Sequence, residues 1–278
     1  MSNASNWLEA QWIEHLFRGD TFAKVPNLYA GLFLTDPGDA NGGTEVTTVG
    51  SGYGRQIIPV SDDSWSAPES AAGYMRCMNL IELEWAQATS DWGTPAYWGL
   101  FDAGTGGNLW IYAPIGGTLR SIGVSDDPVS FAPGALIVST GMAVSDYAEA
   151  KMLNHMLRDD TFTKLSTIYA ALHSSDPNDT GVTGEFDGTG YGRVAISVSD
   201  SSWTEPFESG DETRIENANT ITFPSVLGNW GAYTHAAFWD QLTGGNLLYA
   251  MPFDVVRTVN QGDHAPTYPP GTLSMQIG

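Results

Sequence analysis

Apolar residues recur at intervals of three and four in two stretches of the chain, and this spacing predicts two amphipathic helices. Ser5 and Ser145 precede these stretches and have side chains suited to capping a helix N-terminus, and Gly19 can end the first helix. The apolar positions are Trp7, Leu8, Trp12, Ile13, Leu16 and Phe17 in the first stretch, and Tyr147, Ala148, Met152, Leu153, Met156 and Leu157 in the second.

After each helix the pattern changes to short apolar or alternating runs, which predict β-strands. The predicted strands are 28–34, 56–60, 80–84, 96–101, 109–113 and 136–138, and then 168–173, 194–198, 220–223, 236–239, 247–251 and 273–277. Gly104–Asn108 and Thr243–Asn246 are glycine-rich segments typical of hairpin connections. We therefore predict a mainly β fold: two similar antiparallel β-sandwich or flattened-barrel domains, each with an N-terminal helix.

The two helices and their strands belong to an internal duplication. A shift of 140 residues places His15-Leu-Phe-Arg18 on His155-Met-Leu-Arg158, and Asp36-Pro37 on Asp176-Pro177. After a two-residue slip, Gly52–Arg55 matches Gly190–Arg193, and further tryptophan, glycine and asparagine matches follow. The period is too long for a solenoid. The sequence thus predicts two domains in series, at 1–140 and 141–278, with a short linker at about Ser139–Val144.

Charge and cysteine content narrow the function. The chain has 11 Lys and Arg against 32 Asp and Glu, a net charge of −21, with the acidic excess in both halves. Such a surface repels nucleic acid and anionic membranes. Cys77 is the single cysteine, so no intramolecular disulfide can form. No apolar run reaches the ~18 residues that span a bilayer, and the N-terminus lacks a signal-peptide pattern. We expect a protein made in a host cytoplasm, with no nucleic acid or membrane as partner.

The residues suited to catalysis lack the usual surroundings. His15 and His155 lie on the predicted helices among apolar neighbours, which favours a hydrogen-bonded structural role. His173 has no histidine counterpart in the first half, where Phe33 occupies its place. No nucleophile elbow, P-loop or zinc motif occurs. The acids with counterparts in both halves mostly flank Gly, Pro or Thr, where they serve turns. We therefore expect no catalytic, cofactor-binding or metal-binding residues.

Three weaker signals remain. The segment Asp176–Asp187 spaces its oxygen side chains like a calcium loop, but the first half does not repeat the pattern. Trp65, Trp92, Trp203 and Trp230 could stack on sugars, although their repetition favours core packing. Arg55 and Arg193 each follow Gly-Tyr-Gly, and we expect them to pair with a repeated acid such as Asp36 or Asp176. The less repeated tryptophans are candidate interface anchors: Trp7, Trp12, Trp85, Trp98, Trp110 and Trp239.

The second half carries an ordered set of short motifs. They are Leu153–Asp159, Ile168–Pro177, Gly184-Glu-Phe186 with Gly190–Arg193, Asn219–Pro224, Trp230-Gly231 and Gly244–Tyr249. In this order they resemble a family of small tailed-phage virion proteins, single modules of about this size that are usually labelled tail-fibre proteins. The resemblance covers Leu153–Ile277, and Leu16–Val138 more loosely. It implies a bacteriophage structural protein, located in the virion, with no catalytic residues to carry over.

The position on the particle is a separate question. The sequence has no heptad stalk, collagen-like run or β-helical repeat, which elongated trimeric fibres usually need. We therefore expect a capsid decoration or cement protein, or a short tail or neck attachment protein, oligomeric in the particle and bound to major capsid or tail and neck proteins. The alternatives are a tail-fibre or carbohydrate-binding module for host adsorption, and a polysaccharide hydrolase.

Overall fold

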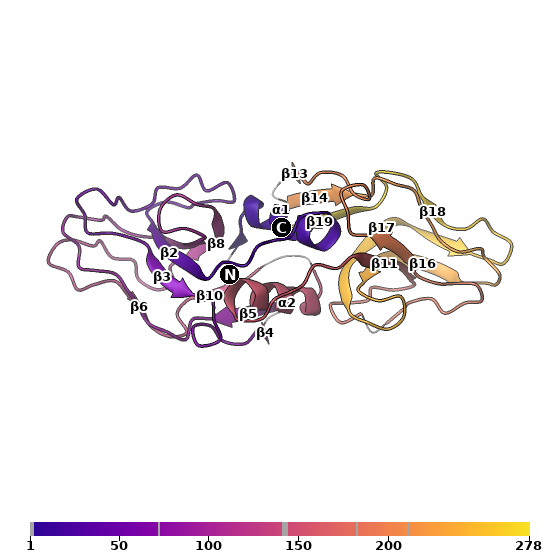
Figure 1. Ribbon diagram of the computed structural model, residues 1–278, viewed down its shortest axis with the longest axis horizontal. Helices are drawn as coiled ribbons and strands as arrows, with labels where there is room; N and C mark the ends of the chain where they lie inside the picture. The colour runs from indigo at the N-terminus through magenta and orange to yellow at the C-terminus, as the bar shows by residue number, and fades with distance from the viewer. Residues whose placement is uncertain (1–2, 72, 141–143, 182, 211) are drawn as a thin grey trace.

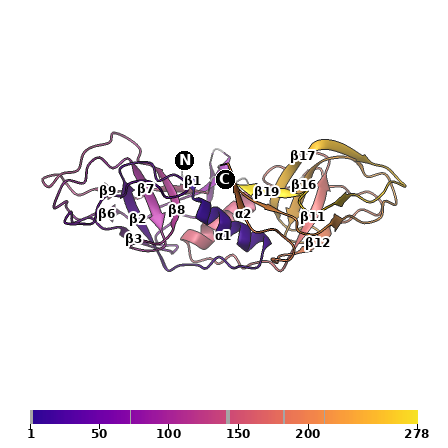
Figure 2. The same ribbon diagram turned by 90° about the horizontal axis from the view of Figure 1, so that it is seen from above.

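The computed structural model describes residues 3–71, 73–140, 144–181, 183–210 and 212–278. The two copies of the repeat form the two ends of an elongated molecule, and the two helices lie between them (Figure 1). We call the elements from β1 to β10 the first copy and those from α2 to β19 the second copy. The first and last strands, β1 and β19, both lie near the middle (Figure 2).

Each copy contains one large antiparallel sheet. In the first copy its order is β1 (Asn3–Ala4), β8 (Leu109–Pro114), β7 (Tyr97–Phe101), β2 (Asn27–Phe33) and β3 (Gln56–Pro59). In the second copy the order is β12 (Val194–Ser197), β11 (Thr167–His173), β16 (Gly231–Trp239) and β17 (Leu247–Val259). The predicted turns at Gly104–Asn108 and Thr243–Asn246 join β7 to β8 and β16 to β17, which confirms both hairpins.

Each copy also contains a three-stranded and a two-stranded antiparallel sheet. The three-stranded sheets are β10 (Ile137–Ser139), β5 (Tyr74–Met78) and β4 (Glu69–Ala71), and then β13 (Phe207–Ser209), β14 (Glu212–Glu216) and β19 (Ser274–Ile277). The two-stranded sheets are β6 (Leu83–Glu84) with β9 (Ser130–Phe131), and β15 (Ile221–Thr222) with β18 (Thr267–Tyr268). The mainly β prediction is confirmed, and the sheets of the described residues are open layers rather than closed rings.

Both predicted helices are present: α1 (Asn6–Phe17) and α2 (Asp146–Leu157). Ser5 and Ser145 are their N-caps, and each side-chain oxygen accepts a hydrogen bond from the backbone N–H three residues on. The first helix ends at Phe17 with Arg18 as its C-cap, so Gly19 follows the cap. Of the predicted linker, residues 141–143 lie outside the described residues.

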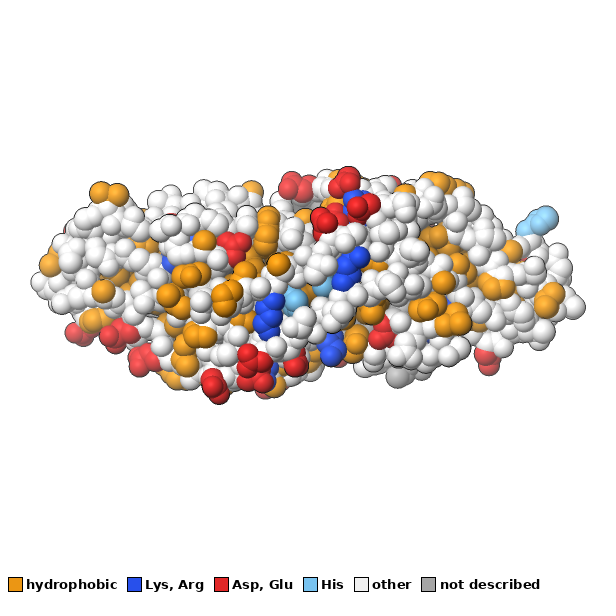
Figure 3. All heavy atoms as spheres, viewed as in Figure 1, with side chains coloured by type: hydrophobic (Ala, Val, Ile, Leu, Met, Phe, Trp, Pro, Cys, Tyr) orange, Lys and Arg blue, Asp and Glu red, His pale blue; other side chains and the backbone are white. Residues whose placement is uncertain are grey.

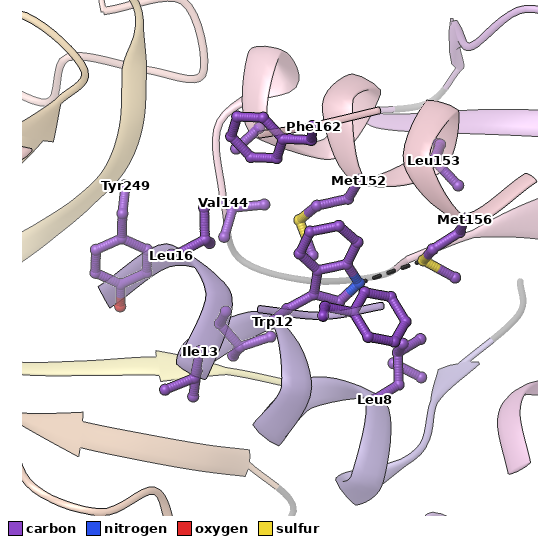
Figure 4. Close-up of a cluster of buried hydrophobic side chains, with 14 of the residues drawn as sticks. Leu8, Trp12, Ile13, Leu16, Val144, Met152, Leu153, Met156, Phe162 and Tyr249 are labelled. Carbon is purple, nitrogen blue, oxygen red and sulfur yellow. Dashed lines mark hydrogen bonds between the residues drawn. The ribbon is translucent and has the colours of Figure 1, made fainter. Parts of the chain in front are cut away.

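The two copies share their hydrophobic core. One continuous cluster of buried side chains includes Trp12 and Leu16 of the first copy together with Met152, Met156 and Phe238 of the second. Side chains from α1 and α2 point toward one another in its centre (Figure 4). Folding of either copy therefore buries apolar surface that belongs to the other, the dominant favourable contribution to stability.

Candidate functional site

The candidate site is the interface between the two copies. There each helix packs on the small sheet of the other copy, an arrangement that we call the exchange of helices. Each helix begins on the large sheet of its own copy. The Ser5 hydroxyl donates a hydrogen bond to the carbonyl of Leu109 at the start of β8, and the Ser145 hydroxyl does the same to Leu247 at the start of β17. The serines thus act as helix caps and also fasten each helix to its sheet.

Each helix then packs on the small sheet of the other copy. Glu9 of α1 accepts a hydrogen bond from the Thr213 hydroxyl on β14, at 2.9 Å. Its counterpart Glu149 of α2 accepts one from the Met75 amide on β5, also at 2.9 Å. Both glutamates are almost fully buried, and burial raises the pKa of Glu9 to about 7 and also raises the pKa of Glu149. These paired contacts define an approximate two-fold relation between the copies.

Arginines at the ends of the helices repeat the same exchange. The Arg18 guanidinium donates to the Trp203 carbonyl at 2.8 Å and pairs with Glu205 at 2.6 Å, both in the second copy. Arg158 donates to the Trp65 carbonyl and pairs with Asp62 at 3.1 Å, both in the first copy. Figure 3 shows several basic side chains over the middle of one face, with acidic side chains beside them. Arg18 and Arg158 therefore serve the interface between the copies.

Aromatic and sulfur contacts fill the centre of the interface. The Trp12 indole Nε1 donates to the Met156 sulfur at 3.3 Å (Figure 4). The Trp12 ring also lies against the rings of Phe22, His15 and His155, with centroids 4.9, 5.4 and 5.6 Å away. Trp12 has no exposed surface. Trp12 therefore anchors the interface between the two copies within one chain, and it offers no surface to a partner protein.

The two histidines have the structural role that the sequence predicts. His15 Nδ1 accepts a hydrogen bond from the Phe22 amide at 3.2 Å, and His155 Nδ1 accepts one from Phe162 at 3.1 Å. Each ring thereby fixes the chain where it leaves its helix. Burial lowers the pKa of both imidazoles, that of His15 to about 4, so both are neutral at pH 7.

The predicted arginine pairs involve a different acid. Arg55 pairs with Glu45 at 2.8 Å, and Arg193 pairs with Glu185 at 2.7 Å, so pairing with Asp36 or Asp176 was wrong. Those aspartates cap turns instead, because each accepts a hydrogen bond from the amide two residues on. Glu45 and Glu185 are bridged to the ends of β2 and β11, which places their carboxylates beside the arginines.

Each arginine also closes the hairpin of its own copy. Arg55 donates to the carbonyls of Ala103 and Gly106, and Arg193 donates to those of Gln241 and Gly244. The guanidinium of Arg193 lies 4.0 Å from the centre of the Trp239 ring. Both arginine side chains are more than nine-tenths buried. These residues hold the hairpins in place, and their charges are used within the copy.

Sequence reasoning missed one repeated buried residue, the asparagine at Asn79 and Asn217. The Asn217 amide nitrogen donates to the carbonyls of Asn219 and Pro269, while its oxygen accepts from the amides of Thr272 and Leu273. Asn79 makes three of these four bonds in the first copy. A shift of 138 residues aligns the two asparagines just as it aligns Trp65 with Trp203, so the signal was present in the repeat.

The tryptophans that could have formed a sugar-stacking surface belong to the core. Trp65, Trp92, Trp203 and Trp230 are all buried, which confirms the core-packing prediction. Among the proposed anchors, Trp85, Trp98, Trp110 and Trp239 are also buried, and Trp7 alone keeps an intermediate exposure.

The described residues contain no cluster of three or more His, Cys, Asp or Glu side chains that could hold a metal ion. In the segment that resembles a calcium loop, Asp176 caps its own turn. His173 and His235 face each other on β11 and β16, with hydrogen bonds to the Thr183 carbonyl and the Thr234 hydroxyl. Neither helix in the described part of the chain is long and apolar enough to cross a membrane.

Comparison with known proteins agrees with the duplication. A sequence model of a family described as podophage GP4 fiber I protein gp80 matches residues 3–139 and again residues 143–276. A search of curated proteins gives no match. The two matched segments correspond to the two copies of the fold, and together they cover nearly the whole chain.

Proposed function

The chain belongs to the podophage GP4 fiber I protein gp80 family as a tandem duplicate, and from this premise we propose that it is a non-enzymatic fibre component in which the two copies form one rigid body. The family makes it a structural protein of the phage virion, associated with other virion proteins. The observation that carries the proposal is the double match to a fibre family, once for each copy.

The exchanged helices support a rigid body rather than two linked domains. Arg18 and Arg158 bind backbone carbonyls of the opposite copy, and Trp12 and Met156 meet in a core that both copies share. Interfaces between loosely joined domains are smaller and more polar than those between parts that stay permanently joined. A rigid body holds its two ends at a fixed distance and orientation, as a short fibre or a connector within a fibre requires.

The two ends of this body differ, which suits a part that joins unlike partners. In the second copy β17 continues to Val259 and pairs again with the beginning of β16. In the first copy β8 ends at Pro114, and the following segment contains only an isolated bridge at Ile122 before β9. We propose that one end attaches to the tail or neck while the other projects, and that several copies of the chain are present on each particle.

We propose 1–140 and 141–278 as the limits of the two modules. We place the protein on the tail rather than on the capsid lattice because the family is a fibre family. Capsid decoration or cementing, which the absence of a stalk pattern favours, is the competing assignment.

The test is cryo-electron microscopy of the phage particle that carries this gene, compared with particles from which the gene is deleted. Density at the tail or neck that fits the two-ended body, and that the deletion removes, is the expected result. Density over the capsid lattice would identify a decoration protein instead. If the deletion removes no density anywhere, the proposed role in the particle is wrong.

A further inference from the structure

A groove of about 540 Å³ lies at the junction of the two copies, beside the beginning of α1. Trp7, Asp39, Asn41 and Asn108 of the first copy and Glu208 of the second copy line it. This volume lies within the ~300–1,000 Å³ that small-molecule sites in proteins occupy.

One wall of the groove is an aromatic ring held in a fixed position. Trp7 stacks on Trp110, with ring centroids 5.9 Å apart and planes 19° from parallel, and it meets the edge of Phe22 at 6.0 Å. Trp110 is itself buried in the core. The part of Trp7 that remains exposed is therefore a preorganised apolar surface, which a ligand can cover without ordering the side chain first.

The rim is composed of polar side chains, each of which keeps at least one oxygen or nitrogen without a hydrogen-bond partner among the described residues. The side chains of Asn41 and Glu208 are exposed and make no hydrogen bond with any residue that the structure describes. One carboxylate oxygen of Asp39 accepts a hydrogen bond from the Tyr112 hydroxyl at 2.6 Å, which fixes the direction of the other. The Asn108 side-chain nitrogen Nδ2 donates to Asp102, and its side-chain oxygen Oδ1 is left to accept.

The charge of the lining selects the class of ligand. Two of the lining residues are acidic, and none of the described lining residues is Lys or Arg. An anionic ligand would be repelled there, within a chain of net charge −21. A fixed aromatic ring beside amides and carboxylates matches a pyranose unit, which has an apolar face and hydroxyls that both donate and accept. We propose that this groove binds a pyranose unit of a neutral saccharide.

The equivalent groove at the other junction keeps Asp179 and Asn246 as the counterparts of Asp39 and Asn108, but it differs in size, at the aromatic wall and at the two exposed rim residues. It measures about 250 Å³. The counterpart of Trp7 is Tyr147, whose ring lies 5.7 Å from the Lys151 ammonium. Gly181 replaces Asn41, and Ser70 replaces Glu208. We therefore expect one saccharide site per chain, on the Trp7 side only. This inference does not depend on where the protein lies on the particle.

The test is isothermal titration calorimetry of the full chain with maltotriose, chitotriose and β-1,4-galactotriose, and with trigalacturonic acid as the anionic control. At least one neutral trisaccharide should bind, and the anionic one should not. Trp7→Ala should weaken binding about tenfold or more, the effect expected when an aromatic stacking surface is removed. Tyr147→Ala, the matched change at the other junction, should leave the affinity unchanged.

Because Trp7 also packs on Trp110, its removal could disturb the fold. Asn41→Gly and Glu208→Ala change exposed rim residues only, and each should weaken binding while the melting temperature stays the same. Glycine is used at position 41 because the backbone there has a φ of 54°, which alanine adopts only at a cost in stability. If none of the three neutral trisaccharides binds, or if binding survives both Trp7→Ala and the rim changes, the proposal is wrong. Equal binding of trigalacturonic acid would contradict the charge argument.

Discussion

The imidazole rings of His15 and His155 lie 5.8 Å apart between centroids at the middle of the interface, yet they are not equivalent. The His155 Nε2 is hydrogen-bonded to the Phe22 carbonyl at 3.1 Å. The His15 Nε2 is buried and has no hydrogen-bond partner among the described residues. The two-fold relation between the copies is therefore only approximate, because the Nε2 atoms of these two histidines have different surroundings.

This difference predicts unequal effects of the same substitution. His155→Phe removes two hydrogen bonds, whereas His15→Phe removes one and also eliminates a buried nitrogen without a partner. We expect His155→Phe to lower the free energy of unfolding by roughly 1 kcal/mol more than His15→Phe. Urea unfolding of the two variants measures the difference, and equal losses would show that neither the second hydrogen bond of His155 nor the unpaired nitrogen of His15 affects stability.

The buried carboxyl of Glu9 predicts a loss of stability at alkaline pH. Burial raises its pKa from 4.5 to about 7, against the opposing hydrogen bond from Thr213, and nearby Asp39 and Glu212 raise it further. The folded state therefore holds a proton that the unfolded state releases above its ordinary pKa. The resulting stability is fully present below pH 4.5 and is lost as the pH rises through 7.

Glu9→Gln should remove this dependence. The variant should melt higher relative to the wild type at pH 8 than at pH 5, and thermal unfolding across that range measures the shift. Glu69→Gln, on an exposed acid paired with Arg76, is the control and should shift little. The histidines act in the opposite direction, because their lowered pKa values reduce stability as the pH falls from 6.5 toward 4. A difference between Glu9→Gln and wild type that did not change with pH would rule out a protonated Glu9.

The buried arginine at the hairpin predicts a large cost for its loss. Arg193→Ala leaves the partly buried Glu185 unpaired and also removes the hydrogen bonds to two carbonyls, so we expect a loss of about 3 kcal/mol. Arg193→Lys should recover only part of it, because an ammonium cannot bind the carboxylate through two parallel hydrogen bonds. Arg76→Ala breaks an exposed pair and should cost less than about 1 kcal/mol. Chemical unfolding of the three variants provides the comparison.

The shared core predicts that both copies unfold together. Trp12→Ala removes a fully buried side chain, which should cost about 3–5 kcal/mol. Since this ring contacts residues of both copies, the loss should shift a single transition rather than split it. Differential scanning calorimetry of the wild type and variant is the measurement. Two separate transitions in the wild type would show that the copies fold independently.

The sequence predicted both helix caps and the strands of the large sheets apart from β1, because these depend on local patterns. Of β16 and β17 it predicted only the parts next to their hairpin. Ser5 and Ser145 could be identified from their position before an apolar stripe. It did not predict β5 and β14, which carry polar and charged residues such as Arg76 and Arg214. In each strand only one face is covered, by the helix of the other copy, so the hydrophobic signal is weak.

The exchange of helices could not be predicted from one copy of the repeat. The apolar face of α1 shows that the helix is buried, but the two small sheets are so similar that the sequence does not say which of them receives it. The predicted partners of the arginines were wrong for a related reason. Glu45 and Glu185 lie beside the arginines only because isolated β-bridges join them to the ends of β2 and β11. Asp36 and Asp176 were plausible partners in sequence but are already used in turns.

The crossed placement of α1 and α2 also limits how the two copies can evolve after duplication. A substitution on α1 has to remain compatible with β14 of the other copy, so each helix and the small sheet that it contacts have to change together. The distal loops of the described chain do not contact the other copy (Figure 1), and there the two copies can diverge independently. A duplicated gene of this design can thus keep a fixed middle while its two ends, and the grooves beside its helices, acquire different tasks.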